Sequence, residues 1–222
     1  MGIIEQALSE NRTTLSEYES KKLLATYGIP VSREVLVLNR AALIPALKQI
    51  GYPMVLKGCS PQISHKTEQG VVRLDVRSEE EALIAYDEIS SSIGNNGAGV
   101  LVQEMVKGQR ELMAGLTRDP QFGPCVMFGL GGIFTEILKD VSFRLAPLEE
   151  KDALDMMEEI KGHRILDAIR GMEQVNRGTV AGILIALGAV GVENERIKEI
   201  DVNPLIIRKG EPIAVDALVV LE

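Results

Sequence analysis

Hydrophobic residues recur at helical spacing in several stretches of the chain. Residues 21–27 place two leucines and a tyrosine on one side of a helix, and the glycine that follows would end it. A serine with a glutamate three residues later, the spacing of a capping box at a helix start, occurs at 16–19 and at 78–81. We predict helices over 21–27, 40–50, 78–89, 149–160 and 179–190.

Other stretches alternate hydrophobic with polar residues, or are short and continuously apolar, as strands are. Within 71–76, for example, Val72, Leu74 and Val76 alternate with residues of the opposite face. We predict strands over 35–38, 54–57, 71–76, 100–106, 111–117, 197–202, 205–207 and 213–215. The segments 125–128 and 134–138 flank a glycine cluster.

Glycine-containing turns join two pairs of these strands. One hairpin is predicted at Lys107-Gly108, between the strands 100–106 and 111–117, and another at Lys209-Gly210. Hairpins require antiparallel pairing, and helices are interspersed with the strands, so the fold class is α+β. The segment 90–99, rich in Ser, Asn and Gly, is the clearest linker. We therefore expect two sub-domains, 1–98 and 99–222.

Composition and charge narrow the function classes. The chain has 222 residues, 45% of them hydrophobic, which excludes general disorder. Its 32 acidic residues outnumber 24 basic ones for a net charge of −8, without the basic run that nucleic acid or an anionic membrane requires. No apolar stretch reaches the ~18 residues of a membrane span, and no signal peptide is visible. Two cysteines and two histidines make a zinc site improbable. We expect a cytoplasmic protein.

The segment 57–70 carries the first candidate site. Lys57 ends a predicted strand, and a polar loop with Gly70 at its end follows. An ammonium with the backbone N–H groups of such a loop suits an anionic ligand. His65 lies in this loop between cationic and acidic neighbours, and neutral imidazole is a nucleophile near pH 7. Alternatively, Lys57 is a solvated lysine on an edge strand and His65 a solvated loop histidine.

A second candidate site is rich in oxygen ligands. On a strand, Asp201 and Asn203 point to one face, and Asp216 ends the adjacent predicted strand. Carboxylate and amide oxygens suit Mg²⁺, which usually also keeps waters and substrate phosphates. The alternative is a solvated polar strand face.

Two further segments have weaker signals. An apolar strand edge at Gln103, Glu104, Met105 and Val106 offers backbone groups for a purine, and Glu111 offers a carboxylate for ribose hydroxyls. Without other information, however, the pattern indicates a hairpin and nothing more. The glycine cluster at 128–132 lacks the Walker A and Rossmann spacings, and a tight turn alone would explain it.

Taken in order, these segments resemble the ATP-grasp domain of NDP-forming acyl-CoA synthetases, specifically the separate β subunit of ADP-forming acetyl-CoA synthetase. The resemblance covers nearly the whole chain, from 15–21 to 214–217. Its most specific pieces are 55–57 (VLK), 64–68 (SHKTE), 117–124 (TRDPQFGP), 126–132 (VMFGLGG), 139–148 (KDVSFRLAPL) and 199–205 (EIDVNPL).

The resemblance implies an ATP-grasp fold of two sub-domains, each with a mainly antiparallel sheet packed by helices. It implies the reaction acyl-CoA + ADP + phosphate ⇌ acid + ATP + CoA, shared with a CoA-binding α subunit in an α₂β₂ assembly. The position that matches the histidine relaying the phosphoryl group is His65.

By the same matching, other residues receive roles at the nucleotide. Lys57, Gly70 and Arg144 would meet phosphates, and Glu111 the ribose. The adenine would lie against Gln103, Glu104, Met105 and Val106, and Mg²⁺ would be held by Asn203, Asp216 and Asp201.

One departure from the family pattern lies at the end of the polar loop that follows Lys57. The family usually has a second glycine where this chain has Val71, and a Cβ there restricts positive φ. Two other readings of the whole chain stay open: an ATP-grasp ligase without a phosphohistidine, and a non-catalytic nucleotide-sensing domain.

Overall fold

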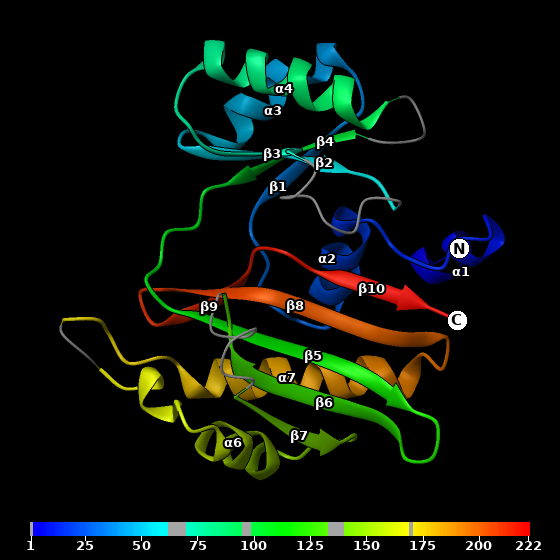
Figure 1. The fold of residues 1–222 in the computed structure, drawn as a ribbon, viewed down its shortest axis with the longest axis vertical. Coiled ribbons are helices and arrows are strands. Elements are labelled where there is room, and N and C mark those ends of the chain that lie inside the picture. The colour runs from blue at the N-terminus through cyan, green and yellow to red at the C-terminus, as the bar shows by residue number, and fades with distance from the viewer. Residues whose placement is uncertain (1, 62–69, 95–98, 133–139, 169–170) are drawn as a thin grey trace. The chain divides into compact units, whose positions relative to one another are not determined.

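The computed structural model describes the chain except for residues 1, 62–69, 95–98, 133–139 and 169–170 (Figure 1). It divides into two compact units. Unit 1 comprises Met1–Leu15, Glu19–Val31 and Val106–Glu222, and unit 2 comprises Ser16–Tyr18 and Ser32–Met105. Each unit has its own sheet and its own hydrophobic core.

Unit 2 is an antiparallel sheet covered by two helices. Within the described residues its strand order is β1-β4-β2-β3, from β1 (Glu34–Val37), β2 (Met54–Cys59), β3 (Val72–Val76) and β4 (Gly99–Glu104). Both α3 (Leu43–Ile50), preceded by a 3₁₀ turn at Arg40–Ala42, and α4 (Glu79–Ile93) pack on this sheet (Figure 1). Helical spacing places Leu43, Leu47 and Ile50 on the buried side of α3.

Unit 1 contains the larger sheet. Its described strands are ordered β10-β8-β5-β6-β7, with β9 paired to β8, and every pairing is antiparallel. Their bounds are β5 Glu111–Asp119, β6 Gly123–Leu130, β7 Val141–Leu145, β8 Ile197–Arg208, β9 Glu211–Ala214 and β10 Leu218–Leu221.

One face of this sheet is covered by helices. Figure 1 shows α7 (Arg177–Glu193) running along β5 and β6, with α6 (Glu150–Glu159) beside it; a 3₁₀ turn, His163–Leu166, lies between the two helices in the chain. Gly191 of α7 allows the closest approach, because a Cβ there would lie 2.4 Å from Cδ1 of Leu116 on β5. A Cβ at Gly188 of α7 would likewise lie 3.6 Å from Cγ2 of Val126 on β6, so Leu116 and Val126 mark the helix-covered face.

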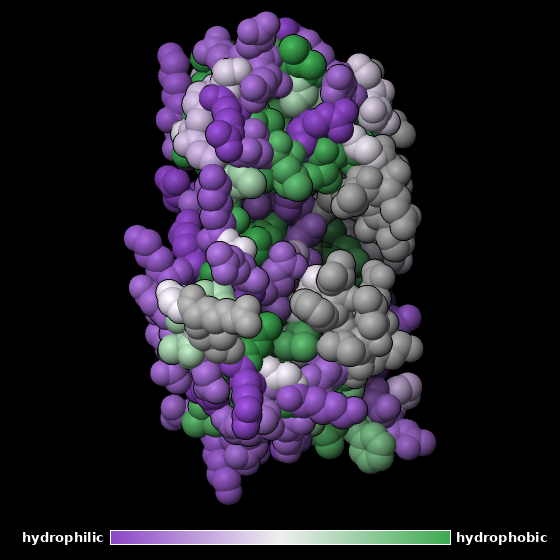
Figure 2. Space-filling model, turned by 60° about the vertical axis from the view of Figure 1, so that its left-hand side comes forward, coloured by the Kyte–Doolittle hydropathy of each residue, from purple (hydrophilic) through white to green (hydrophobic). Residues whose placement is uncertain are grey.

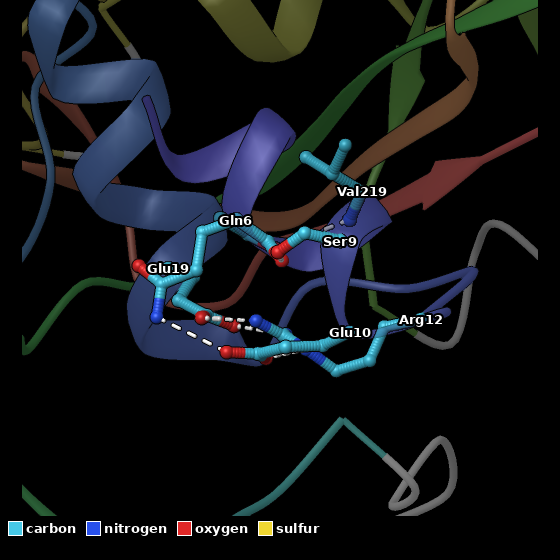
Figure 3. A network of polar contacts seen from close by, with 7 residues as sticks. Gln6, Ser9, Glu10, Arg12, Glu19 and Val219 are labelled. Carbon is cyan, nitrogen blue, oxygen red and sulfur yellow. Dashed lines mark hydrogen bonds and ion pairs between the residues drawn. The ribbon is translucent and has the colours of Figure 1, made fainter. Parts of the chain in front are cut away.

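The N-terminal helices α1 (Ile3–Ser9) and α2 (Glu17–Thr26) contribute to unit 1, α2 from Glu19 onward. The amide of Leu15 donates to the carbonyl of Val219 over 3.0 Å. Arg12 donates to both carboxylate oxygens of Glu19 over 2.8 and 2.9 Å and to Glu10 over 2.8 Å, as Figure 3 shows. Glu19, which the sequence pattern assigned to a capping box, thus holds the segment between the two helices.

The predicted α+β class and antiparallel sheets are confirmed, but two local predictions are wrong. The strands on either side of Lys107-Gly108 form no hairpin, because β4 pairs with β1 and β2 in unit 2 whereas β5 pairs with β6 and β8 in unit 1. The predicted linker 90–99 begins too early, since α4 continues to Ile93. The segment 134–138, which follows the glycine cluster, lies outside the described residues.

The division into units also differs from the expected boundary between 98 and 99. β4 lies between β1 and β2, so the chain leaves unit 2 only after Met105. At the N-terminus, Leu15 and Leu24 belong to the core of unit 1, so α1 and α2 from Glu19 onward lie in unit 1, and only residues 16–18 of this region belong to unit 2.

The surface is mainly hydrophilic on the face that Figure 2 shows. Hydrophilic side chains dominate the face in Figure 2, and hydrophobic ones appear there in small groups. None of the helices in the described part of the chain is both long and apolar enough to cross a membrane.

Candidate functional site

The oxygen-rich segment of β8 forms the clearest candidate site. Ile200 and Val202 are buried, while Asp201 and Asn203 alternate with them and are half-buried. Asp201 lies opposite Gly115 of β5 and Leu218 of β10. Because Ile200 pairs with Leu116, which faces α7, Asp201 and Asn203 lie on the other face of the sheet. The predicted alternation is confirmed.

A hollow of about 240 Å³ lies at these residues, entirely within unit 1. Its lining comes from β5, β6 and β8: Met113, Leu116, Thr117, Met127, Glu199, Ile200, Asp201 and Asn203. The lining thus combines two acidic residues, Glu199 and Asp201, with two methionines.

Asp216 follows β9, which pairs with β8 so that Ala214 lies opposite Leu205. The amide of Val215 donates to the carbonyl of Pro204 over 3.2 Å. This places the chain before Asp216 beside the end of the Asp201–Asn203 segment, as the sequence predicted. The Asp216 carboxylate accepts a hydrogen bond from the amide of Ala217 over 2.9 Å.

The electrostatics of Asp201 are those of a site that receives a cation. Burial, and then the negative charges of Asp216 and Glu199, raise the pKa of Asp201 to about 6. Its Oδ1 is buried and has no hydrogen-bond partner among the described residues. A carboxylate oxygen of this kind is stabilised by a divalent cation, so these residues fit the expected Mg²⁺.

The fit depends on oxygen donors other than side-chain carboxylates. In the described part of the chain, no group of three or more His, Cys, Asp and Glu residues is arranged to hold a metal. Mg²⁺ is commonly held by one or two carboxylates with substrate phosphates and waters completing the shell. The amide oxygen of Asn203 adds a further hard donor.

Lys57 lies on β2, an inner strand of unit 2, opposite Leu101 of β4 and Val72 of β3. Its Nζ donates to Oε1 of Glu17 over 2.8 Å, and only 9% of the lysine side chain is exposed. The reading of Lys57 as a solvated lysine on an edge strand is therefore wrong. Sequence reasoning missed Glu17 as its partner, because it assigned Glu17 only to the start of a helix.

The loop after Lys57 is described only at its end, and His65 lies outside the described residues. Gly70 has a φ of +68°. Val71, where the family usually has glycine, is buried in the core of unit 2, and its carbonyl accepts from the amide of Gly58 over 2.8 Å. The valine thus packs under β2, and the left-handed backbone occurs at Gly70.

The residues predicted to meet the adenine lie along the end of β4. Gln103 is buried. Glu104 accepts from the amide of Arg33 over 3.0 Å and pairs with its guanidinium at 3.4 Å. Met105 donates to the carbonyl of Pro53 over 3.3 Å and ends unit 2, whereas Val106 begins unit 1.

Glu111, predicted to meet the ribose, begins β5 in unit 1. Its carbonyl accepts from the amide of Gly131 over 2.9 Å, and its carboxylate lies where a Cβ of Gly132 would be. The glycine cluster therefore permits a close backbone approach beside Glu111.

The preceding residue, Arg110, was also missed. It is buried and donates to the carbonyls of Ile165, Asp167 and Glu173. It thereby anchors the start of β5.

Arg144 is not brought together with these residues. It lies opposite Val126, on the helix-covered face, and pairs with Glu159 of α6 at 2.5 Å. Its expected contact with phosphate gains no support from this position.

A family model and the sequences of known proteins indicate the same family for this chain. The model of the ATP-grasp domain matches residues 6–221. The β subunit of the ADP-forming acetate–CoA ligase I of Pyrococcus furiosus is 45% identical over 224 residues, which cover 99% of this chain and 96% of the relative.

Solved structures agree. Dinucleotide-forming acetyl-coenzyme A synthetase 1 of Ca. Korarchaeum cryptofilum, in complex with coenzyme A, Ca-AMPCP and HgCl⁺, has a TM-score of 0.93 and 44% identity, covering 99% of this chain and 98% of that one. A second structure of that protein, with coenzyme A and Mg-AMPPCP and a phosphohistidine segment pointing towards the nucleotide-binding site, has a TM-score of 0.88 with the same identity and coverage. The chain belongs to the ATP-grasp domain family, among the β subunits of ADP-forming acetyl-CoA synthetases.

Proposed function

We propose that this chain transfers a phosphoryl group through His65 to Mg-ADP, as its part of the reaction acyl-CoA + ADP + phosphate ⇌ acid + ATP + CoA. In the transfer to nucleotide, the P–N bond to the imidazole breaks and a P–O bond to the terminal phosphate of ADP forms. The observation that carries the proposal is the orphaned oxygen of Asp201 beside Asn203 and Asp216, in a chain that resembles acetate–CoA ligase β subunits along its whole length.

The side chains of unit 1 supply the oxygen ligands and the ribose contact. Asp201, Asn203 and Asp216 would hold Mg²⁺, which offsets charge repulsion between the phosphates when it is bound. The cation in the Mg-AMPPCP complex of the Korarchaeum relative supports this choice of metal. Glu111 would accept hydrogen bonds from the ribose hydroxyls.

Side-chain and backbone groups of unit 2 would supply the phosphate contacts and most of the adenine contacts. Lys57 would bind the phosphate chain, with the amide of Gly70 beside it. Gln103, Glu104 and Met105, continued by Val106, would receive the adenine edge through backbone groups. The nucleotide analogues bound to the Korarchaeum relative, AMPCP and AMPPCP, support an adenine nucleotide as the ligand.

Since this chain would bind the nucleotide and the metal, the expected partner is a CoA-binding α subunit, in an α₂β₂ assembly. The relative from Pyrococcus furiosus is named as a β subunit, and the Korarchaeum structures contain coenzyme A. Acetate is the expected acid, because two β subunits from Pyrococcus furiosus that are 45% and 42% identical to this chain are named as parts of acetate–CoA ligases.

The proposal is tested by combining this chain with its cognate α subunit and measuring ATP formation from acetyl-CoA, ADP and phosphate. His65→Ala is expected to abolish it, together with acid-labile phosphate on the chain after incubation with Mg-ATP. His163→Ala, which removes the chain's other histidine, is the matched control and should retain both.

Two outcomes would contradict the proposal. Full activity of His65→Ala would indicate an ATP-grasp ligase without a phosphohistidine. A wild-type chain that binds no Mg-ADP in calorimetry would instead indicate a domain without catalytic function.

A further inference from the structure

Glu17 and Lys57 form a buried ion pair within unit 2. Their side chains are 0% and 9% exposed, and Nζ lies 2.8 Å from Oε1. The two residues are 40 positions apart in the chain: Glu17 is the first residue of α2, whereas Lys57 comes from the inner strand β2. The contact is therefore tertiary, and the fold must bring two charges together out of water.

Such a pair is a poor device for stability alone. Desolvation of both charges opposes their attraction, and apolar side chains of similar size often stabilise a fold as well. The fully buried carboxylate of Glu17 is better explained if it holds the charged ammonium of Lys57 in a position where a ligand binds it.

We propose that Glu17 is a positioning residue that fixes the ammonium of Lys57 for the phosphate chain of the nucleotide. A lysine has a flexible four-carbon stem, and a bound nucleotide would otherwise have to immobilise it. Glu17 restrains the stem before the nucleotide arrives. An ammonium has three N–H donors, so a bond to Glu17 is compatible with a bond to a phosphate oxygen.

Because this role rests on the phosphate contact proposed for Lys57, the experiment must separate the two. Mg-ADP affinity is measured by calorimetry on the full chain assembled with its α subunit. The variants are Glu17→Gln, Glu17→Asp, Lys57→Met and the double variant Glu17→Gln/Lys57→Met. Adenosine, which lacks phosphates, is titrated in parallel.

We expect Glu17→Gln to weaken Mg-ADP binding about tenfold, from the rotamer freedom that Lys57 regains. Glu17→Asp, which keeps the charge, should restore part of the affinity. The double variant should bind no more weakly than Lys57→Met, since Glu17 acts through the lysine. Adenosine affinity should not change in any Glu17 variant.

Glu19→Gln is the matched control. It makes the same charge change two residues further along α2 and breaks the pair with Arg12, but Mg-ADP affinity should stay at the wild-type value.

Four results would overturn the inference. Unchanged or tighter Mg-ADP binding by Glu17→Gln would show that the carboxylate does not assist the lysine. Additive losses in the double variant, or an equal loss of adenosine affinity, would show a purely structural role. If Lys57→Met itself binds Mg-ADP normally, the phosphate contact proposed for Lys57 fails, and the role of Glu17 fails with it.

Discussion

Asp201 of β8 lies directly opposite Gly115 of β5, on the face of the sheet that α7 does not cover. Since glycine has no side chain, β5 places nothing over the carboxylate at this register. The next residue across the sheet is Met127 of β6, which lines the same hollow. The carboxylate of Asp201 is therefore accessible from this face because the residue opposite it on β5 is glycine.

The first prediction concerns this glycine. A Cβ at Gly115 would lie 2.6 Å from the backbone oxygen of Ile200, and a backbone atom cannot move aside as a flexible side chain can. We expect Gly115→Ala to shift β8 and to lower the free energy of unfolding by about 1–3 kcal/mol. Urea denaturation measures this, and Mg-ADP affinity should fall as well because Asp201 and Asn203 move.

Gly182→Ala is the control for this prediction. Gly182 is an exposed residue inside α7, and nothing lies within 4 Å of a Cβ built there. The alanine should raise stability by about 0.5–1 kcal/mol. A Gly115→Ala chain as stable as the Gly182→Ala chain would contradict the close approach of β5 and β8.

Turn chemistry and periodicity predicted those parts of the fold that depend on neighbouring residues. Lys209 and Gly210 both have positive φ, at 51° and 80°, and they join β8 to β9 as expected of a two-residue hairpin. The turn at Lys107-Gly108 has the same Lys-Gly sequence, yet the strands before and after it belong to different sheets. Which partners a strand finds depends on distant residues, and a local pattern does not contain them.

The candidate site divides in the same way. Asp201 and Asn203 could be placed on one face from strand alternation alone. The pairing of Lys57 with Glu17 could not, because it joins residues 40 apart that reach each other only in the folded unit. The helix-covered position of Arg144 likewise depends on its register with β6.

A second prediction concerns Arg118 at the end of β5. Its guanidinium donates to the carbonyls of Gly191 and Asn194 at the end of α7, over 2.6 and 3.0 Å, and to Ile197 over 2.9 Å. These bonds satisfy carbonyls that have no partner within the helix, and the cation is favoured at a helix C-terminus. We expect Arg118→Ala to lower the free energy of unfolding by about 2–3 kcal/mol in urea denaturation.

Arg77→Ala provides the comparison for Arg118. Arg77 binds Asp75 by an exposed ion pair, with side chains 66% and 40% exposed. Exposed pairs contribute little, so this loss should stay below about 1 kcal/mol. Equal losses in the two variants would contradict a specific role of Arg118 at the end of α7.

A third prediction follows from the pKa of Asp201, which is raised to about 6. An unfolded aspartate has a pKa of about 4, so between pH 4 and 6 the folded chain holds a proton that the unfolded chain releases. Asp201 therefore makes the metal-free chain less stable as pH rises through this window, by up to about 1.4 kcal/mol per pH unit, with no further change above it.

Urea denaturation in the presence of a chelator, from pH 4 to 8, measures this effect as the difference between the wild-type chain and Asp201→Asn. Subtraction removes carboxylates with the opposite trend, such as Glu159, whose pKa is lowered by Arg144. Asparagine keeps the size of the side chain and cannot ionise, so Asp201→Asn should gain stability relative to wild type as pH rises to about 6.

Saturating Mg²⁺ should stabilise the wild type above pH 6 far more than the variant, because only the ionised carboxylate of Asp201 attracts the cation. Parallel pH curves for the two proteins would contradict the raised pKa of Asp201, because they would show that Asp201 is ionised as easily in the folded chain as in water.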